Sequence, residues 1–181
     1  MKTTLNKIRD KSPCEDGWKK LLAHLGKTKA DDEPLKIAEI LDSNGLDDAL
    51  WCLRAVEGHD QELRLYAVRC ARQVQHLMTD KRSIDALDVA ERFANDSATQ
   101  AELDAAWTAA RAAARAAAGA AAWAAAWAAA RAAAGASAWD AARAAAWDAA
   151  RAASIAADAA GASAWDAQEA ELRRVCAGVS A

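Results

Sequence analysis

Apolar residues recur every three or four positions along the first half of the chain, which is the spacing of one face of an α-helix. The clearest apolar stripe consists of Leu63, Tyr66, Cys70, Val74 and Leu77. Charged residues lie away from this stripe, as they do on the solvent side of a helix that packs against a core. We find no run of alternating apolar and polar residues bounded by turn signals, the mark of a half-buried strand. The pattern therefore predicts an all-α protein.

Capping and turn residues divide this half into five predicted helices. Ser12 is placed to cap the first helix, and Gly26 to end it. Asp32 is placed to cap the second helix, and Gly45 to stop it. The predicted helices cover residues 13–25, 34–43, 46–56, about 63–77 and 83 onward. Short helices joined by short turns suggest an antiparallel bundle or a HEAT-like stack.

The second half is mostly alanine, interrupted at every fourth position. The interrupting residues, called here the tetrad ladder, are Trp107, Arg111, Arg115, Gly119, Trp123, Trp127, Arg131, Gly135, Trp139, Arg143, Trp147, Arg151 and Ile155. Alanine has the highest helix propensity, so this half is predicted to be helical. Ser97 with Gln100, and Thr99 with Glu102, have the spacing of a capping box at its start. We therefore divide the chain into an N-terminal helical domain, residues 1–96, and a tetrad-repeat helical region, residues 97–181.

The four-residue step of the ladder argues against one long helix. Because an α-helix has about 3.6 residues per turn, each step rotates the ladder by roughly 40°, and a straight rod would scatter its tryptophans around the axis. Breaks at Gly119, Gly135 and Gly161 would instead give several short antiparallel helices, each with a Trp/Ala face turned inward. The alternative is that these glycines are tolerated inside a long helix at about 1 kcal/mol each. The broken version is the prediction.

Charge and cysteine content narrow the classes of function. The 181 residues carry 23 Lys+Arg against 26 Asp+Glu, a net charge of −3, so the chain lacks the basic footprint of a sequence-specific nucleic-acid-binding protein. The longest charge-free stretch, residues 116–130, is too short to cross a bilayer, and the N-terminus has no apolar signal-peptide segment. The four cysteines fit no zinc-binding spacing and indicate reduced thiols. These features predict a cytoplasmic protein that does not bind a membrane.

Few residues in the chain could carry catalysis. His59-Asp60 has the arrangement of a base with its orienting carboxylate, but Asp60 is explained more simply as a helix cap. No nucleophile motif accompanies the three histidines. The acidic clusters at residues 31–33 and 47–48 are explained more simply as carboxylates at helix N-termini than as a cation site. We therefore expect a protein with no enzymatic activity, no cofactor and no metal site.

The tetrad ladder is the best candidate for a binding surface. Tryptophan and arginine are the residues most enriched at protein-binding hot spots, and they could also clamp a nucleotide by stacking and phosphate pairing. Asp140 with Arg143, and Asp148 with Arg151, have the spacing of intrahelical ion pairs. The alternative is structural: tryptophan forms the core, and the charged residues solubilise the helices. The candidate partner- or ligand-binding residues are Trp123, Trp127, Arg131, Trp139, Arg143, Trp147 and Arg151.

Several segments together resemble a known family. They are residues 44–56, 64–78 and 83–92, followed by the alanine-rich tail that closes in Glu171–Cys176. In the order of these segments, and over most of its length, the chain is similar to the immunity-protein family of bacterial polymorphic-toxin loci and prophages. The resemblance implies an all-helical, non-enzymatic protein that neutralises a partner by binding it.

Three functions are consistent with the ladder and the resemblance. The leading one is an inhibitor of another protein, either a toxin or a bacterial defence complex. The second, suggested by the prophage association, is an anti-defence sponge that binds a nucleotide signal. The third is a structural homo-oligomer held together by Ala/Trp packing. The first requires ladder residues exposed to a protein, and the second requires a pocket where Trp rings meet several arginines.

Overall fold

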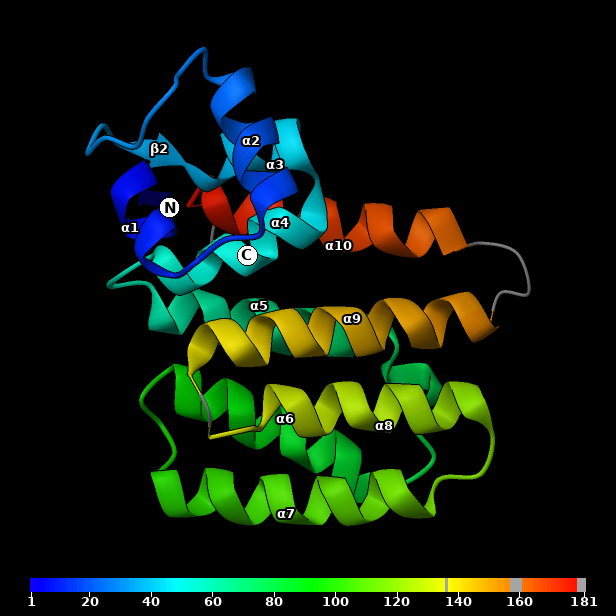
Figure 1. Ribbon diagram of the computed structural model, residues 1–181. Helices are drawn as coiled ribbons and strands as arrows, with labels where there is room; N and C mark the ends of the chain where they lie inside the picture. The colour runs from blue at the N-terminus through cyan, green and yellow to red at the C-terminus, as the bar shows by residue number, and fades with distance from the viewer. Residues whose placement is uncertain (136, 157–160, 179–181) are drawn as a thin grey trace. The chain divides into compact units, whose positions relative to one another are not determined.

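The computed structural model describes residues 1–135, 137–156 and 161–178 (Figure 1). Within these residues it has ten α-helices, two short 3-10 helices and one sheet of two strands, each two residues long. The predicted all-α class is confirmed. None of the helices in the described ranges is both long enough and apolar enough to span a membrane.

The chain packs as two units. The first consists of Met1–His59 and the end of the chain from Arg173, and the second of Asp60–Leu172. The boundary between the units does not coincide with the change in composition at residues 96 and 97. Helix α6 (Lys81–Ala94) packs against α7 (Gln100–Ala116), so both helices belong to the same unit. Helix α10 (Gly161–Cys176) contributes residues to both units.

The first unit is built from short helices and the small sheet. Its elements are β1 (Lys2–Thr3), α1 (Leu5–Asp10), α2 (Glu15–His24), β2 (Leu35–Lys36), α3 (Ile37–Asn44), α4 (Leu46–Cys52), the 3-10 helix η1 (Leu53–Ala55) and the last turn of α10. Helix α3 packs against both α2 and α4. The core is aliphatic, and Leu5, Ile8, Leu21, Ile40 and Leu50 are each no more than 2% exposed. Removing these side chains from water supplies the main free energy that stabilises the unit.

The small sheet corrects one prediction. Residues 34–36 are not helical, because β2 pairs antiparallel with β1, with Thr3 opposite Leu35, and α3 begins only at Ile37. The Thr3 hydroxyl then donates a hydrogen bond of 2.6 Å to the carbonyl of Ala55. Strands of two residues are too short to show any periodicity, which is why the sequence pattern does not reveal them.

In the first unit, the C-terminal ends of the helices agree with the predictions better than the N-terminal ends do. Ser12 does not cap α2; its φ is +58°, and the N-cap residue is Cys14. Gly26 and Gly45 follow the helices that they were predicted to end, and both have positive φ. The predicted helix over residues 46–56 is α4 followed by η1.

The second unit is an antiparallel array of longer helices. Its elements are α5 (Asp60–Gln73), the 3-10 helix η2 (Gln75–Leu77), α6, α7, α8 (Ala120–Ala132), α9 (Ala138–Ala156) and α10 as far as Leu172. Helix α8 packs against both α7 and α9, while α5 packs against α8 and α9, and α6 against α7 and α8 (Figure 1). From α7 through α8 to α9 the chain reverses direction at each step, as expected for neighbouring helices joined by short connections (Figure 1).

The apolar stripe of the first half lies on the buried side of α5 and continues beyond its end into η2. Leu63, Tyr66, Cys70 and Val74 are buried as predicted, and Leu77 is half-buried in η2. Tyr66 is fully buried, and its hydroxyl donates a hydrogen bond of 3.3 Å to a carbonyl of α10. This bond satisfies the polar tip of an otherwise apolar side chain.

The tetrad ladder is broken into separate helices, as predicted. Gly119 is the N-cap of α8, with φ +89° and ψ 142°, a conformation that is open mainly to glycine. Gly135 lies in the connection between α8 and α9, and Gly161 is the first residue of α10. At the start of α7, Thr99 forms the predicted capping box with Glu102, whereas Ser97 does not.

Alanine, not tryptophan, forms the core between the ladder helices. Seven alanines of α8 and eight of α9 are buried. Trp123 and Trp147 are 37% and 41% exposed, and Trp107, Trp127 and Trp139 are half-buried. The prediction of a Trp/Ala face turned inward is therefore wrong for tryptophan. Methyl side chains let the helix backbones approach closely, and a close-packed interface of this kind has no volume for an indole.

Candidate binding surface

Ladder residues of the antiparallel helices α8 and α9 lie next to each other. Arg151 of α9 places its guanidinium carbon 5.4 Å from the ring centroid of Trp123 on α8. Nε of Arg131 on α8 lies 3.6 Å from Oδ2 of Asp148 on α9. We call the residues of this face the Trp/Arg surface; they are Trp123, Trp127, Arg131, Arg143, Trp147, Asp148 and Arg151.

Aromatic and cation–π contacts connect neighbouring residues of this surface. The rings of Trp123 and Trp127 lie 6.0 Å apart at an interplanar angle of 63°. The guanidinium of Arg131 lies 5.3 Å from the Trp127 ring centroid. Edge-to-face and cation–π contacts of this kind each contribute about 0.5–1 kcal/mol at exposed sites. The side chains are therefore held in place by one another.

A tryptophan from outside the ladder joins the Trp/Arg surface. Trp165 of α10 meets Trp147 with ring centroids 5.0 Å apart and an interplanar angle of 80°. Trp165 is not part of the tetrad ladder, because it lies beyond the last ladder residue, Ile155, and on another helix. Its only signal was Asp166, which repeats the Trp-Asp dipeptide of the ladder.

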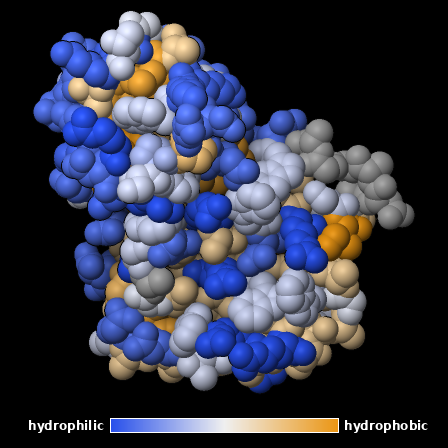
Figure 2. Space-filling view, viewed as in Figure 1, coloured by the Kyte–Doolittle hydropathy of each residue, from blue (hydrophilic) through white to orange (hydrophobic). Residues whose placement is uncertain are grey.

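The surface exposes apolar area beside charge. Trp123, Trp147 and Ile155, at 37%, 41% and 38% exposed, are the exposed large hydrophobic residues in the described part of the chain. Figure 2 shows pale and strongly hydrophilic side chains side by side over α8 and α9. Aromatic area beside arginine is the composition found at the centre of protein interfaces.

A hollow in this surface combines both signs of charge. Arg131, Arg143, Trp147 and Asp148 line it. Burial raises the pKa of the Asp148 carboxyl, and the charges of Arg131 and Arg151 act in the opposite direction. The Asp148 carboxylate therefore offsets part of the positive charge of the arginines around it.

Two buried donors of the Trp/Arg surface have no acceptor among the residues that the structure describes. They are Nε1 of Trp127 and Nε of Arg143. A buried N–H that lacks an acceptor costs about 1–3 kcal/mol. Because both atoms are enclosed by neighbouring side chains, a bound molecule would not reach them unless those side chains moved.

The structure changes the ion pairing that the sequence predicts for the ladder. Asp148 pairs with Arg131 on the neighbouring helix, while Arg151, its expected partner, lies over Trp123. Asp140 accepts a hydrogen bond of 3.1 Å from the Ser137 hydroxyl.

Trp139 is half-buried in the first turn of α9, about 12 Å along the helix axis from Trp147. Its membership of the binding surface stays a prediction, whereas the other six candidates lie together.

Acidic side chains in the described ranges pair with nearby cations and do not gather into a metal site. Within residues 1–135, 137–156 and 161–178 there is no group of three or more side chains suited to hold a metal ion. In the acidic cluster at residues 31–33, the Lys27 ammonium lies 2.6 Å from carboxylate oxygens of both Asp31 and Glu33. The hydrogen bond from Lys27 lowers the pKa of Asp31. This cluster is thus a local ion pair network.

Comparisons with protein-family models, with curated proteins and with solved structures found no significant match. These comparisons therefore do not identify a ligand or a partner for the Trp/Arg surface.

Proposed function

We propose that the chain is a cytoplasmic, non-enzymatic binding protein that neutralises a partner protein through the Trp/Arg surface. The observation that carries this proposal is the position of the ladder tryptophans outside the alanine core. Buried alanines already fill the space between α8 and α9, so the indoles are not needed to pack the helices. Exposed apolar area of this kind marks interaction sites on soluble proteins.

The arrangement of the surface supports a tight protein contact. The cation–π contact of Arg151 with Trp123 and the edge-to-face contact of Trp123 with Trp127 restrict these side chains. Side chains that are already ordered lose less entropy when a partner binds.

The partner is proposed to be a toxin or a bacterial defence complex. The family resemblance of segments such as residues 44–56 and 64–78 supports an immunity protein, and the prophage association supports an anti-defence inhibitor. Both activities consist of occupying another protein, and neither requires a catalytic group.

A nucleotide-signal sponge is the alternative. In its favour, Trp147 shares a hollow with Arg131 and Arg143. Against it, the Asp148 carboxylate lies in the same hollow, 3.6 Å from Arg131, where it would repel a phosphate. Calorimetry against cyclic and ADP-ribose-type nucleotides separates the two, because strong heats from any of them would favour the sponge.

The test uses the product of the neighbouring gene in the operon as the candidate partner. The double variant Arg143→Ala/Arg151→Ala should lower the melting temperature by no more than about 2–4 °C, the cost of one cation–π contact, and should lose inhibition of that partner. The matched control is Arg111→Ala/Arg115→Ala, which removes two ladder arginines from α7 instead. It should inhibit as the wild type does. Equal inhibition by all three proteins would show that the Trp/Arg surface is not the binding site.

A further inference from the structure

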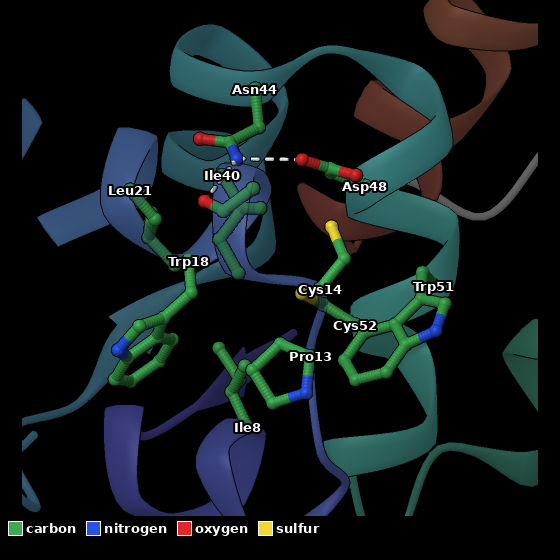
Figure 3. A pocket seen from close by; sticks show the side chains of 11 residues that line it. Ile8, Pro13, Cys14, Trp18, Leu21, Ile40, Asn44, Asp48, Trp51 and Cys52 are labelled. Atoms are coloured by element: carbon green, nitrogen blue, oxygen red, sulfur yellow. Dashed lines mark hydrogen bonds between the residues drawn. The ribbon is translucent and has the colours of Figure 1, made fainter.

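A cavity in the first unit lies between the start of α2 and the helices α3 and α4, far along the sequence from the tetrad ladder (Figure 3). Its volume is about 110 Å³. Apolar cavities of roughly 150 Å³ can hold a molecule the size of benzene, so this one suits a ligand of about five non-hydrogen atoms. Both tryptophans that lie outside the alanine-rich half, Trp18 and Trp51, line it.

The walls of the cavity are apolar. Trp18 and Trp51 lie on opposite sides in Figure 3, with Leu21 on the side of Trp18, and Ile40 is another aliphatic side chain of the lining. Leu21 and Ile40 are buried, whereas the two indoles are half-buried and so reach the surface. Walls of this kind favour an alkyl chain over a polar ligand.

One end of the cavity is polar and is held by a hydrogen-bond network. The side-chain amide of Asn44 donates to Oδ2 of Asp48 at 2.7 Å and to the carbonyl of Gly17 at 2.9 Å. A Cβ at position 17 would lie only 2.7 Å from Oδ2 of Asp48. The absence of a side chain at Gly17 is therefore what lets the carboxylate approach α2, although a glycine inside a helix costs about 1 kcal/mol.

The charge in this cavity is negative. Cys52 also lines it, and burial together with the Asp48 charge raises the pKa of this thiol to about 12, so the thiol stays neutral. No lysine or arginine is among the described residues that line the cavity. Lys19, next to Trp18 in sequence, pairs with Glu15 instead.

The surroundings already include a contact between an indole and a cation. The guanidinium carbon of Arg54 lies 4.1 Å from the ring centroid of Trp51, and Nε of Arg54 donates to the Trp51 carbonyl at 3.2 Å. Arg54 is not one of the cavity-lining residues. Aromatic rings next to a carboxylate are the combination that recognises alkylammonium groups.

We propose that this cavity binds an aliphatic ammonium group, with the alkyl chain between Trp18 and Trp51 and the cation paired with Asp48. The charge-assisted bond to Asp48 supplies the selectivity, and the apolar walls supply the affinity. The ammonium group comes either from a small free amine or from a lysine side chain of another protein. This site is independent of the Trp/Arg surface, and its test does not need the partner proposed above.

The experiment titrates the ¹⁵N-labelled protein with n-butylammonium and, as the uncharged match, with n-butanol. Shifts of the indole N–H signals of Trp18 and Trp51 report binding. Butylammonium should bind about tenfold more tightly than butanol, as expected for one hydrogen bond to a charged group. Equal affinities, or no shift of either indole signal, would overturn the proposal.

Two variants assign the charge. Asp48→Asn should bring the affinity for butylammonium down to that for butanol, whereas Asp47→Asn, the same change one residue earlier, should leave it unaltered. If Asp48→Asn does not fold, Cys14→Leu adds bulk at an exposed lining position and should abolish the shifts. Binding of butylammonium at the wild-type affinity in whichever of these two variants folds would contradict the site.

A third ligand identifies the source. N-acetyl-lysine N-methylamide presents the ammonium as a protein would. Binding as strong as that of butylammonium supports a lysine side chain as the natural occupant. Binding of butylammonium alone supports a free amine.

Discussion

Arg151 of α9 lies over the indole of Trp123 on α8, with 5.4 Å between the guanidinium carbon and the ring centroid. The contact joins two helices that bury alanine side chains and are also linked by the ion pair of Arg131 with Asp148. It therefore pairs a ladder residue of one helix with a ladder residue of the next helix.

This contact should appear as an energetic coupling in a double-mutant cycle. Trp123→Ala and Arg151→Ala, measured singly and together by urea unfolding, should show a coupling of about 0.5–1 kcal/mol, as found for exposed cation–π pairs. The control combines Trp123→Ala with Arg111→Ala, an arginine of α7 that lies over Trp107 instead. That second pair should be additive. Additivity in both cycles would mean that the Trp123–Arg151 contact does not form in solution.

The alanine interface should resist larger side chains. Ala145 of α9 is fully buried, and a leucine there would force the closely packed helices apart at a cost of about 1–3 kcal/mol or more. Ala112→Leu on α7 makes the same substitution at an exposed position and should change the free energy of unfolding by no more than about 0.5 kcal/mol. Urea unfolding of both variants measures the difference. A tolerated leucine at position 145 would mean that the helices are loosely packed.

The helix breaks could be predicted from the sequence, but the direction of the ladder could not. A four-residue step is incompatible with a straight amphipathic helix, and that geometric fact is enough to require breaks near Gly119 and Gly135. Whether Trp123 points inward depends on how closely the backbones of α8 and α9 approach. That distance is a property of the packed pair, which no single-helix pattern contains.

The same dependence on helix packing explains why the sequence predicts neither the partner of Asp148 nor the cavity in the first unit. Asp148 was expected to pair within its own helix, and its partner Arg131 comes from the neighbouring one. The cavity between Trp18 and Trp51 depends on Gly17 allowing Asp48 to approach, and residues 17 and 48 are brought together only by the fold. Local capping signals did better: Thr99 and Glu102 form the box that their spacing predicts.

Two of the three predicted break glycines, Gly119 and Gly135, should differ in how much stability is lost when they are replaced by alanine. Gly119 has φ +89° and nothing within 4 Å of an added Cβ, so Gly119→Ala tests backbone strain alone and should cost about 1–3 kcal/mol. Gly135 does not have positive φ, and an added Cβ would lie 2.9 Å from the side-chain nitrogen of Gln100 and 3.0 Å from Oδ1 of Asp104. These side-chain ends can move, so Gly135→Ala should cost less. Equal losses in urea unfolding would contradict the positive φ at Gly119.

The N-cap of α6 should titrate far below an ordinary aspartate. Asp80 accepts hydrogen bonds from the Arg82 guanidinium, at 2.6 Å to Oδ2, and from the Arg82 backbone N–H, at 2.9 Å to Oδ1. These bonds favour the charged carboxylate and lower the pKa of Asp80 to about 2. Because the folded-state pKa is below the unfolded value of about 3.9, the stabilisation is present above that value and is lost as the pH falls towards 2. An NMR titration of the Asp80 carboxyl carbon measures the pKa directly.

Arg82→Gln should raise that pKa, because the side-chain hydrogen bonds from Arg82 are its largest cause and the backbone N–H remains. Arg92→Gln, in the last turn of the same helix, removes the same charge without touching Asp80 and should leave the titration unchanged. An Asp80 that titrates near 3.9 in the unmodified protein would show that the Arg82 side chain does not hold the cap. An equal rise in both variants would assign the shift to the general field of positive charge, whereas a rise in Arg82→Gln alone assigns it to the hydrogen bonds at the cap.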